Sequence, residues 1–490
     1  ASGAPEKARQ TFGRHPVLFP GVFQPLWLIE GLATYQETDS ERGIGRGQSS
    51  FYDMLMRTEV TSGIKPIHQV NQFIRTWPMG TTPYLYGYYF YKFGEERYGV
   101  EKLKALITHY GSNLIPFRLN SNSIAVLGKN LPALWKEYEH YLREKYEPQM
   151  SRIRDRGVIE GTPLTHHGYF TNQTRSSATG ALYYIRADGR SDPALMMIEP
   201  DELKPQRLVK LHNNARFDIH ESAGIVIAQP ERYRNANLFY DLYHFDINTR
   251  RMKRLTKGRR YRFAAWSPSG DRLAAVQNKK GRHRLHLLDQ DGRYLETLWQ
   301  GMNGELLSYI DWSPVSQTLV AIMWRPDSGW NLEEFDINAR RWHSLTSDAA
   351  IQLYPQYTWQ GDEVLFSADY GGVYNVQRLD LATKKIETIT NVRSGAFYPT
   401  ISGDGTLYYT GYDSQGYEVY RMANQSKVLG EPEQDLGTTA QYRAIPEISY
   451  KLTDTVYQAQ NGLKPTWWSP FVFIDSDFTI GGALTGGSDP

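Results

Sequence analysis

Runs of alternating apolar and polar residues recur at a near-constant interval in the second half of the chain. Four of them begin as a strand-like stretch, pass through a Gly or polar turn and return as a second apolar run. Such alternation is typical of two strands joined by a tight turn. The four runs are WSPSGDRLAAV from Trp266, DWSPVSQTLVAI from Asp311, YTWQGDEVLFSA from Tyr357 and TISGDGTLYYTG from Thr400. Aligned on Trp266, Trp312, Trp359 and Ile401, they are spaced by 46, 47 and 42 residues.

A second kind of strand pair lies between these runs. Residues 242–256, 332–346 and 376–390 each hold an apolar strand, a turn that begins with Asp and a strand that ends in Leu-Thr or Ile-Thr. The turn residues Asp246, Asp336 and Asp380 are expected to accept backbone N–H groups, which is a structural role. Two weaker units at residues 169–213 and 214–260 bring the number of repeats to six.

These repeats predict a β-propeller from about residue 169 to about residue 428, within a domain of residues 160–430. A four-stranded unit buries both of its faces only by stacking on neighbours in a closed ring. We expect six blades, with seven as the alternative. The W-S-P-x-G-x-x-L-A strand pair resembles the TolB-like propeller repeat over about 260 residues. The resemblance implies an architecture and no particular chemistry, because propellers serve as binding platforms, gates and enzymes.

Residues 1–150 show helical spacing instead. Apolar positions between residues 25 and 37 recur on one helical face, and further helices are predicted over residues 51–57, 84–98, 100–110 and 131–146. The fold class we predict is therefore multidomain α and β. A mainly α-helical domain in residues 1–150 precedes the all-β propeller, and residues 431–490 form a linker and an extended tail.

Composition narrows the possible partners. The net charge of +2, with no basic stripe, gives no support for nucleic-acid binding. The absence of Cys excludes disulfides and thiolate metal sites, and it fits a protein of the bacterial envelope, periplasmic or associated with the outer membrane. No apolar run is long enough to cross a membrane as a helix. The abrupt first and last residues lead us to expect a piece of a longer protein.

The string PLWLIEGLATYQE, residues 25–37, resembles the second zinc motif of the gluzincin metallopeptidases. In that family the first Glu of the motif is the third protein ligand of zinc, which maps onto Glu30, and Gly31 and Ala33 would keep the helix slim. PYLYG, residues 83–87, resembles the Tyr-x-x-Gly element whose phenol stabilises the oxyanion. That role maps onto Tyr84, with Tyr86 and Tyr88 as alternatives.

Residues 123–142 also resemble the closing helices of the peptidase domain, so residues 1–150 would be its helical half. The resemblance implies zinc as the cofactor and a peptide or protein as the substrate. Read from the residues alone, Glu30 is equally a surface carboxylate and Tyr84 equally a packed core residue. Glu37 fits a supporting or surface carboxylate better than a metal ligand.

The first half of the zinc site is missing from the sequence. Gluzincins carry H-E-x-x-H on a helix, with two imidazoles and a general base. The nearest string, residues 220–224, lacks the second His and falls in a predicted propeller strand. The family spacing would place the motif before Ala1, so we expect this chain alone to be inactive. His283 and His286 would diverge in a strand and are predicted to be solvated or turn residues.

The last 25 residues, TWWSPFVFIDSDFTIGGALTGGSDP, alternate aromatic, apolar and small residues. They resemble the segment that leads into the first strand of a surface-antigen outer-membrane barrel, which implies association with the outer membrane through a missing barrel. The alternative is an extended tail packed on the propeller. Residues 430–465 fit either a linker or strands that close the ring.

Two functions follow from these patterns. The first is a zinc-dependent peptidase of the bacterial envelope, incomplete in this chain, whose propeller binds or screens peptide or protein substrates. The second is a non-enzymatic propeller scaffold that binds an envelope protein. Glu30 and Tyr84 favour the first, and the missing H-E-x-x-H favours the second for this polypeptide.

Overall fold

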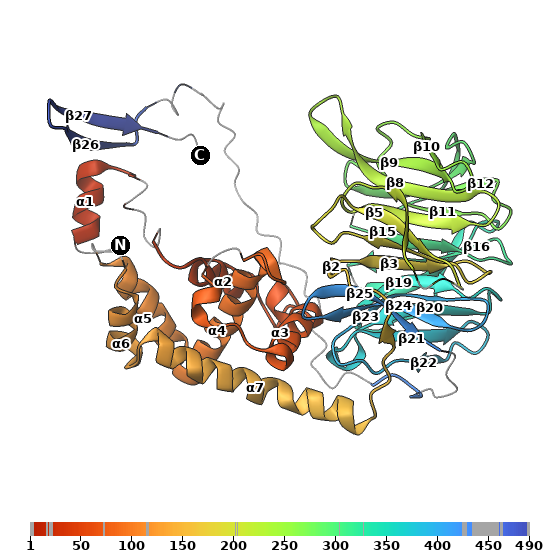
Figure 1. The fold of residues 1–490 in the computed structure, drawn as a ribbon, viewed down its shortest axis with the longest axis horizontal. Helices are drawn as coiled ribbons and strands as arrows, with labels where there is room; N and C mark the ends of the chain where they lie inside the picture. Colours follow the sequence, from red (N-terminus) through yellow and green to blue (C-terminus); the bar gives the residue numbers. More distant parts are fainter. Residues whose placement is uncertain are drawn as a thin grey trace.

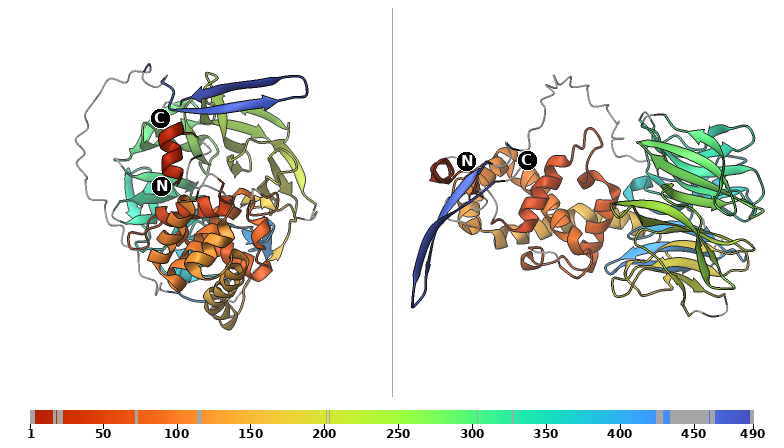
Figure 2. Two further views of the ribbon diagram at one scale, coloured as in Figure 1. Left: turned by 90° about the vertical axis from the view of Figure 1, so that its left-hand side faces the viewer. Right: turned by 90° about the horizontal axis from the view of Figure 1, so that it is seen from above.

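The computed structural model of the chain has a helical region followed by a six-bladed β-propeller (Figure 1). It describes residues 4–15, 18, 23–71, 74–113, 117–200, 202, 204–302, 304–326, 328–423, 429–433, 460 and 464–487. The predicted fold class is therefore confirmed. The helical region sits against one end of the propeller, as the view from above also shows (Figure 2).

The helical region is built around an aromatic core. Its helices are α1 (Ala4–Phe12), α2 (Leu26–Glu37), α3 (Ser50–Ser62), α4 (Thr82–Tyr98), α5 (Val100–Gly111), α6 (Leu119–Leu127) and α7 (Leu131–Asp155), with 3₁₀ turns at Arg46–Gln48 (η2), Ile67–Gln69 (η3) and Met79–Thr81 (η4). Helix α4 is central and buries residues on almost every side. The Trp27 ring of α2 packs edge-on against Phe90 of α4 and Trp135 of α7, at centroid distances of 4.9 and 5.3 Å. Such edge-to-face contacts add to the free energy gained by burying the rings.

Each of the first five blades is one antiparallel sheet whose strands follow in chain order. The blades are β3 (Asn172–Ser176), β4 (Leu182–Arg186), β5 (Ala194–Ile198), β6 (Gln206–Lys210); β7 (Arg216–His220), β8 (Gly224–Tyr233), β9 (Asn237–Asp246), β10 (Arg251–Arg254); β11 (Tyr261–Trp266), β12 (Arg272–Lys279), β13 (Arg282–Asp289), β14 (Tyr294–Gln300); β15 (Leu306–Trp312), β16 (Thr318–Arg325), β17 (Gly329–Asp336), β18 (Arg341–Ser344); and β19 (Gln352–Tyr357), β20 (Glu363–Ala368), β21 (Asn375–Asp380), β22 (Ile386–Thr388). A 3₁₀ turn at Tyr370–Gly372 (η5) lies within the fifth blade. In the described residues a separate apolar cluster fills each gap between neighbouring blades, including the gap between the sixth and the first. The stacking of blades therefore supplies the core, as the repeats predicted.

The sixth blade is completed by residues from the start of the propeller. Strands β23 (Ala396–Ile401), β24 (Leu407–Asp413) and β25 (Gly416–Met422) take β1 (Thr162–Pro163) as the outer strand, and β2 (Tyr169–Phe170) also pairs with β25. The ring is thus closed by the segment that precedes it. Residues 429 and 430 bond the edge of the fifth blade at Thr388 instead. The rest of the predicted linker, residues 434–459, lies outside the described residues.

The alignment of the repeats was wrong in one place. Ser267, Ser313, Thr358 and Ser402 donate equivalent turn hydrogen bonds from their backbone N–H groups. The residue that precedes Thr358, Tyr357, therefore corresponds to Trp266 and Trp312, and Trp359 does not. The corrected spacing from residue 266 to 312, 357 and 401 is 46, 45 and 44 residues. Periodicity could not separate the two aromatic residues, because positions two apart share a strand face.

The predicted Asp turns have the expected structure. Asp246, Asp336 and Asp380 each accept hydrogen bonds from the backbone N–H groups two and three residues further on. These bonds stabilise the turn between the two outer strands of a blade.

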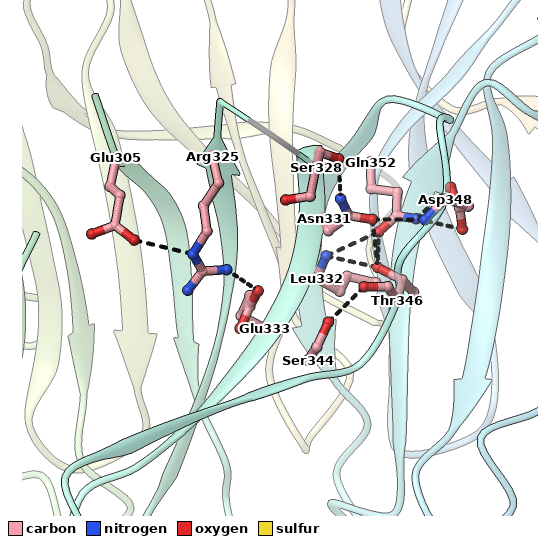
Figure 3. A network of polar contacts seen from close by, with 10 residues as sticks. All are labelled: Glu305, Arg325, Ser328, Asn331, Leu332, Glu333, Ser344, Thr346, Asp348 and Gln352. Carbon is pink, nitrogen blue, oxygen red and sulfur yellow. Dashed lines mark hydrogen bonds and ion pairs between the residues drawn. The ribbon is translucent and has the colours of Figure 1, made fainter. Parts of the chain in front are cut away.

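The Thr that ends each of these strand pairs joins the outer strands to the following loop. Thr346 accepts a hydrogen bond from the Leu332 N–H at 2.9 Å, and the Asn331 amide oxygen accepts one from the Asp348 N–H (Figure 3). Gln352 of the next blade accepts from Leu332 and donates to Asp348, so the network crosses between blades. The same Asp/Asn–Thr pairing recurs at residues 241 and 256 and at residues 375 and 390. The recurring Leu-Thr ending thus satisfies buried backbone groups.

Hydrogen bonds from α3 and α7 anchor the helical region to the propeller. Arg57 of α3 is 1% exposed and donates to the carbonyl oxygens of Arg393 and Ser394 at 3.0 and 2.7 Å. Its guanidinium also donates to Gln149 of α7 at 2.8 Å. Burial lowers the pKa of Arg57. Trp77 adds a hydrogen bond to the Tyr412 phenol at 2.6 Å.

The C-terminal residues form a hairpin of β26 (Trp467–Ile474) and β27 (Thr479–Gly486). Trp468 stacks near Phe12 of α1 and donates to the Thr11 carbonyl at 2.9 Å, so the hairpin packs on α1 (Figure 1). The prediction of an extended tail packed on the propeller is wrong. No helix in the described part of the chain is both long and apolar enough to serve as a membrane span.

The prediction of solvated histidines is wrong for His286. Its side chain is buried, and its Nδ1 lies 2.9 Å from the Tyr261 hydroxyl. Burial, with the nearby Arg284 and Arg259, lowers the pKa of His286 to about 4. The imidazole is therefore neutral at pH 7. A strand pattern with polar neighbours does not reveal that a blade above covers this face.

Replacement of Arg57 by Met tests the anchor between the two domains. The substitution leaves two buried carbonyl oxygens without a donor, so we expect the free energy of unfolding to fall by about 2–4 kcal/mol. Urea unfolding followed by Trp fluorescence measures the change. Arg143→Met is the control because Arg143 is exposed on α7, and we expect a change below about 0.5 kcal/mol. Equal unfolding curves for wild type and Arg57→Met would contradict the anchoring role.

Candidate functional site

The two residues implied by the gluzincin resemblance lie side by side. Glu30 is on α2 and Tyr84 is in the first turn of α4, 54 positions later in the chain. Burial and a hydrogen bond to the Glu30 carboxylate raise the pKa of Tyr84. The phenol is therefore protonated at neutral pH and can donate a hydrogen bond.

A backbone contact between two glycines brings these residues together. A Cβ atom built on Gly31 would overlap the backbone of Gly87, and one built on Gly87 would overlap Gly31 and the Trp27 carbonyl oxygen. Helices α2 and α4 thus touch without intervening side chains, which only glycine permits. Gly31 keeps its helix slim as expected, although against α4. Ala33 is exposed and makes no such contact in the described structure.

Arg46 of η2 covers the outer side of this pair. Its guanidinium lies 5.0 Å from the centre of the Tyr84 ring and donates to Glu37 at 2.5 Å. The hydrogen bond to Glu37 raises the pKa of Arg46. Both ends of the ion pair are about half exposed, so Glu37 is a surface carboxylate, as the sequence favoured.

The two alternative tyrosines are occupied elsewhere. Tyr86 is buried, donates to Glu59 at 2.6 Å and accepts from the Lys65 N–H at 2.8 Å. Tyr88 is buried over Gly47. Tyr84 is therefore the phenol of this element that lies beside Glu30.

The residues of this chain do not complete a zinc site. No group of three His, Asp or Glu side chains that could hold a metal ion occurs in the part of the chain that the structure describes. A peptidase zinc needs three protein ligands. Glu30 alone does not fit that requirement, so no catalytic step through a metal follows from these residues.

A second candidate site lies on the axis of the propeller. One residue from the inner strand of each blade lines its narrowest part: Gln173, Arg216, Phe263, Tyr309, Tyr354 and Tyr398. We call these six residues the inner ring. Four of them, in β3, β15, β19 and β23, have positive φ angles between 49° and 57° at register shifts of the strand. Non-glycine residues in this region are strained, and such strain is common at functional sites.

The next layer along the axis is an ion-pair network. Arg175, two residues after Gln173, pairs with Asp311 at 2.6 Å and with Asp218 at 3.5 Å. The two carboxylates also accept the Tyr357 and Trp266 backbone N–H groups at 2.8 Å. These bonds cross the axis and join four blades, so they close the channel at this level.

A chamber of about 680 Å³ separates the inner ring from the helical region. Arg216, Tyr354 and Tyr398 form its floor, and Phe51 of α3 contributes to its wall. The neighbouring residue on α3, Tyr52, lies against Arg46 beside Tyr84. The first turn of α3 therefore separates the chamber from Glu30 and Tyr84. A second cavity, of about 650 Å³, occupies the opposite end of the axis and is lined by Trp266, Trp312 and Trp359.

The sequence analysis missed the inner ring and Arg46. A signal for the ring was present, because Tyr309, Tyr354 and Tyr398 each precede the corresponding strand-ending residue by three positions. The error at Trp359 obscured that regularity. Arg46 lies in a short polar loop without a motif, so its contact with Tyr84 had no sequence signal.

Three solved structures resemble the chain, all at low similarity. TolB from Acinetobacter baumannii is 15% identical over 64% of this chain and 76% of its own, with a TM-score of 0.37. The β-propeller domain of the trilobed protease from Pyrococcus furiosus is 12% identical over 54% and 99%, with a TM-score of 0.38. A puromycin-hydrolysing peptidase of Mycobacterium tuberculosis is 14% identical over 57% and 48%, with a TM-score of 0.36. No family model and no curated protein matches the chain. The propeller is therefore defined by its own strand pairing.

Replacement of Gly87 by Ala tests the contact between α2 and α4. The new methyl group overlaps backbone atoms that cannot rotate away, so the helices must separate, and we expect stability to fall by about 2–3 kcal/mol. Gly94→Ala in the same helix is the control, because its Cβ would meet only the movable Leu103 Cδ2 at 2.6 Å. Urea unfolding of both variants measures the difference. Equal losses for the two would show that the contact is not a close backbone crossing.

Proposed function

We propose that this chain is the peptide-holding part of a zinc peptidase of the bacterial envelope. Glu30 would be the third metal ligand and Tyr84 the oxyanion donor. The observation that supports this most strongly is the contact between the Glu30 carboxylate and the Tyr84 phenol, because two separate motifs predicted these residues. Two unrelated surface residues had no reason to be placed together by a glycine crossing.

The chain's own groups suit these roles. A carboxylate is a good third ligand beside two imidazoles. The Tyr84 phenol stays protonated at neutral pH and can stabilise negative charge that develops on a substrate carbonyl oxygen. The Arg46 guanidinium beside the ring adds positive charge on the same side. The two imidazoles and the general base would be supplied by residues other than those printed here.

The propeller would hold the substrate next to these groups. The chamber has the volume of a ligand-binding cavity and lies one helical turn of α3 away from Tyr84. Phe51 faces the chamber and Tyr52 faces Arg46, so the same turn borders both places. An extended peptide in the chamber would therefore emerge near Glu30.

A scaffold without enzymatic activity is the second candidate. It is favoured by the absence of a three-residue metal group from the described residues. The propeller, closed by β1 and by six inter-blade clusters, needs no metal for its fold. In this case the chamber would bind a segment of an envelope protein and Glu30 would have no metal.

Zinc titration separates the two candidates. We expect the printed chain to bind no zinc tightly at one-to-one stoichiometry. If the gene encodes H-E-x-x-H ahead of these residues, the longer protein should bind one zinc, and Glu30→Gln should weaken binding at least tenfold and abolish peptide hydrolysis. Calorimetry and a fluorogenic peptide assay measure both effects.

Two matched variants complete that experiment. Glu37→Gln should leave zinc affinity and activity within about twofold, because Glu37 bonds Arg46 at the surface. Tyr84→Phe should retain zinc and lose about 10²–10³ in kcat. The proposal is contradicted if the longer protein lacks H-E-x-x-H, or if Glu30→Gln changes neither zinc affinity nor activity.

A further inference from the structure

Two arginines point toward the propeller axis in adjacent layers, and only one has a carboxylate partner. Arg175 is ion-paired with Asp218 and Asp311. Arg216 has no ion pair with an acid among the described residues. The two aspartates are already engaged by Arg175 and by backbone N–H groups. Arg216 therefore carries a positive charge that its surroundings leave uncompensated.

The groups around Arg216 are neutral. Its guanidinium donates to the neighbouring Ala215 carbonyl at 2.9 Å and bonds the Tyr309 phenol. Its Nε is buried without a hydrogen-bond partner within the described structure. Tyr354 and Tyr398 lie close by, with ring centres 3.6 Å apart, and burial raises the pKa of both. A buried cation with an unmade hydrogen bond is costly unless an anion completes it.

We propose that Arg216 binds the terminal carboxylate of an extended peptide that enters the chamber between the propeller and the helical region. The planar guanidinium matches a carboxylate with two parallel hydrogen bonds, and the surrounding phenols supply further donors. Arg216 is the only Lys, Arg, Asp or Glu in the described lining of the chamber. An anionic group that enters therefore meets one attractive charge and no repulsive one.

The rest of the chamber suits a peptide. Aromatic and aliphatic side chains such as Phe170, Leu353 and Phe397 form its walls and can contact apolar side chains. Beside the floor, Gln173 is 7% exposed and its Oε1 atom has no partner among the described residues. Its Nε2 donates to the Phe217 carbonyl at 2.7 Å, which fixes the amide. The free oxygen is thus an acceptor for a peptide N–H close to the anion site.

The channel favours a chain end over a residue within a chain. Behind Arg216 the free space shrinks to about 50 Å³, and the ion pairs of Arg175 cross the axis beyond it. A peptide cannot continue through such a passage. The opening lies at the other side, where exposed His212, Asn213 and Asn214 line the rim. A peptide that enters there stops with its last residue at Arg216.

This inference rests on the peptide-holding half of the proposed function and is independent of the metal. Peptide binding needs neither zinc nor Glu30. If the Glu30 assignment failed, the carboxylate site would stand, and the reverse also holds.

Fluorescence anisotropy with the full chain tests the proposal. The probe is an apolar hexapeptide of Ala, Leu and Phe, labelled at its N-terminus, with a free C-terminal carboxylate. Its amidated form is the matched ligand. We expect the free acid to bind at least tenfold more tightly than the amide. Arg216→Gln should remove this difference and Arg216→Lys should retain part of it, while Arg251→Gln, an exposed position on β10, should bind as wild type.

A third peptide distinguishes the source of the carboxylate. It carries a Glu side chain before an amidated end, and we expect it to bind as weakly as the plain amide. Equal affinity for this peptide and the free acid would overturn the assignment to a chain end. Equal affinity for free acid and amide in the wild-type protein would overturn the anion site even if Arg216→Gln failed to fold. No binding of any peptide would overturn both this inference and the peptide-holding half of the proposed function, whereas Glu30→Gln should bind peptide normally.

Discussion

The seating of the helical region on one end of the propeller determines where both candidate sites lie. Arg57 reaches from α3 to the carbonyl groups at Arg393 and Ser394, and its burial makes the position of α3 costly to change. Because α3 is held there, its first turn forms a wall of the chamber on one side and supports Arg46 on the other. The two sites are therefore neighbours in space, although Tyr84 and Arg216 are far apart in the sequence.

Within the propeller, the two-residue period of a strand explains the layers along the axis. Alternate residues of each inner strand point into the channel, so Gln173 and Arg175 belong to successive layers. The register shifts turn large residues such as Tyr309 and Tyr354 inward. One layer became an ion-pair network that closes the channel, and the other became a ring of phenols around a single guanidinium. The same geometry thus yields a structural plug and a surface that can bind an anion.

Much of the fold was accessible from sequence because it depends on repetition and local chemistry. The Asp turns at residues 246, 336 and 380 and the six repeats were predicted correctly, since each requires only short-range patterns. The predicted helices match in position, and α3, α4 and α7 are longer than expected. The register at Trp359 and the burial of His286 were not predictable, because both depend on the neighbouring strands or the next blade.

Prediction of the candidate sites succeeded only where a linear motif existed. Glu30 and Tyr84 lie in short strings, and their proximity is confirmed, whereas their roles remain predictions. Arg216 belongs to no string and is distinguished only by the missing carboxylate partner, which is a property of the folded ring. The Gly31–Gly87 crossing likewise has meaning only once two helices are in contact.

Hydrogen–deuterium exchange of the full chain, with and without the free-acid hexapeptide, tests the central claim most directly. The account predicts that peptide slows exchange in the first turn of α3 around Phe51 and in β7 and β23, which meet at the chamber. The amidated peptide should have little effect. Slower exchange only at the opposite end of the axis, around Trp266, Trp312 and Trp359, would contradict a peptide held between the propeller and the helices.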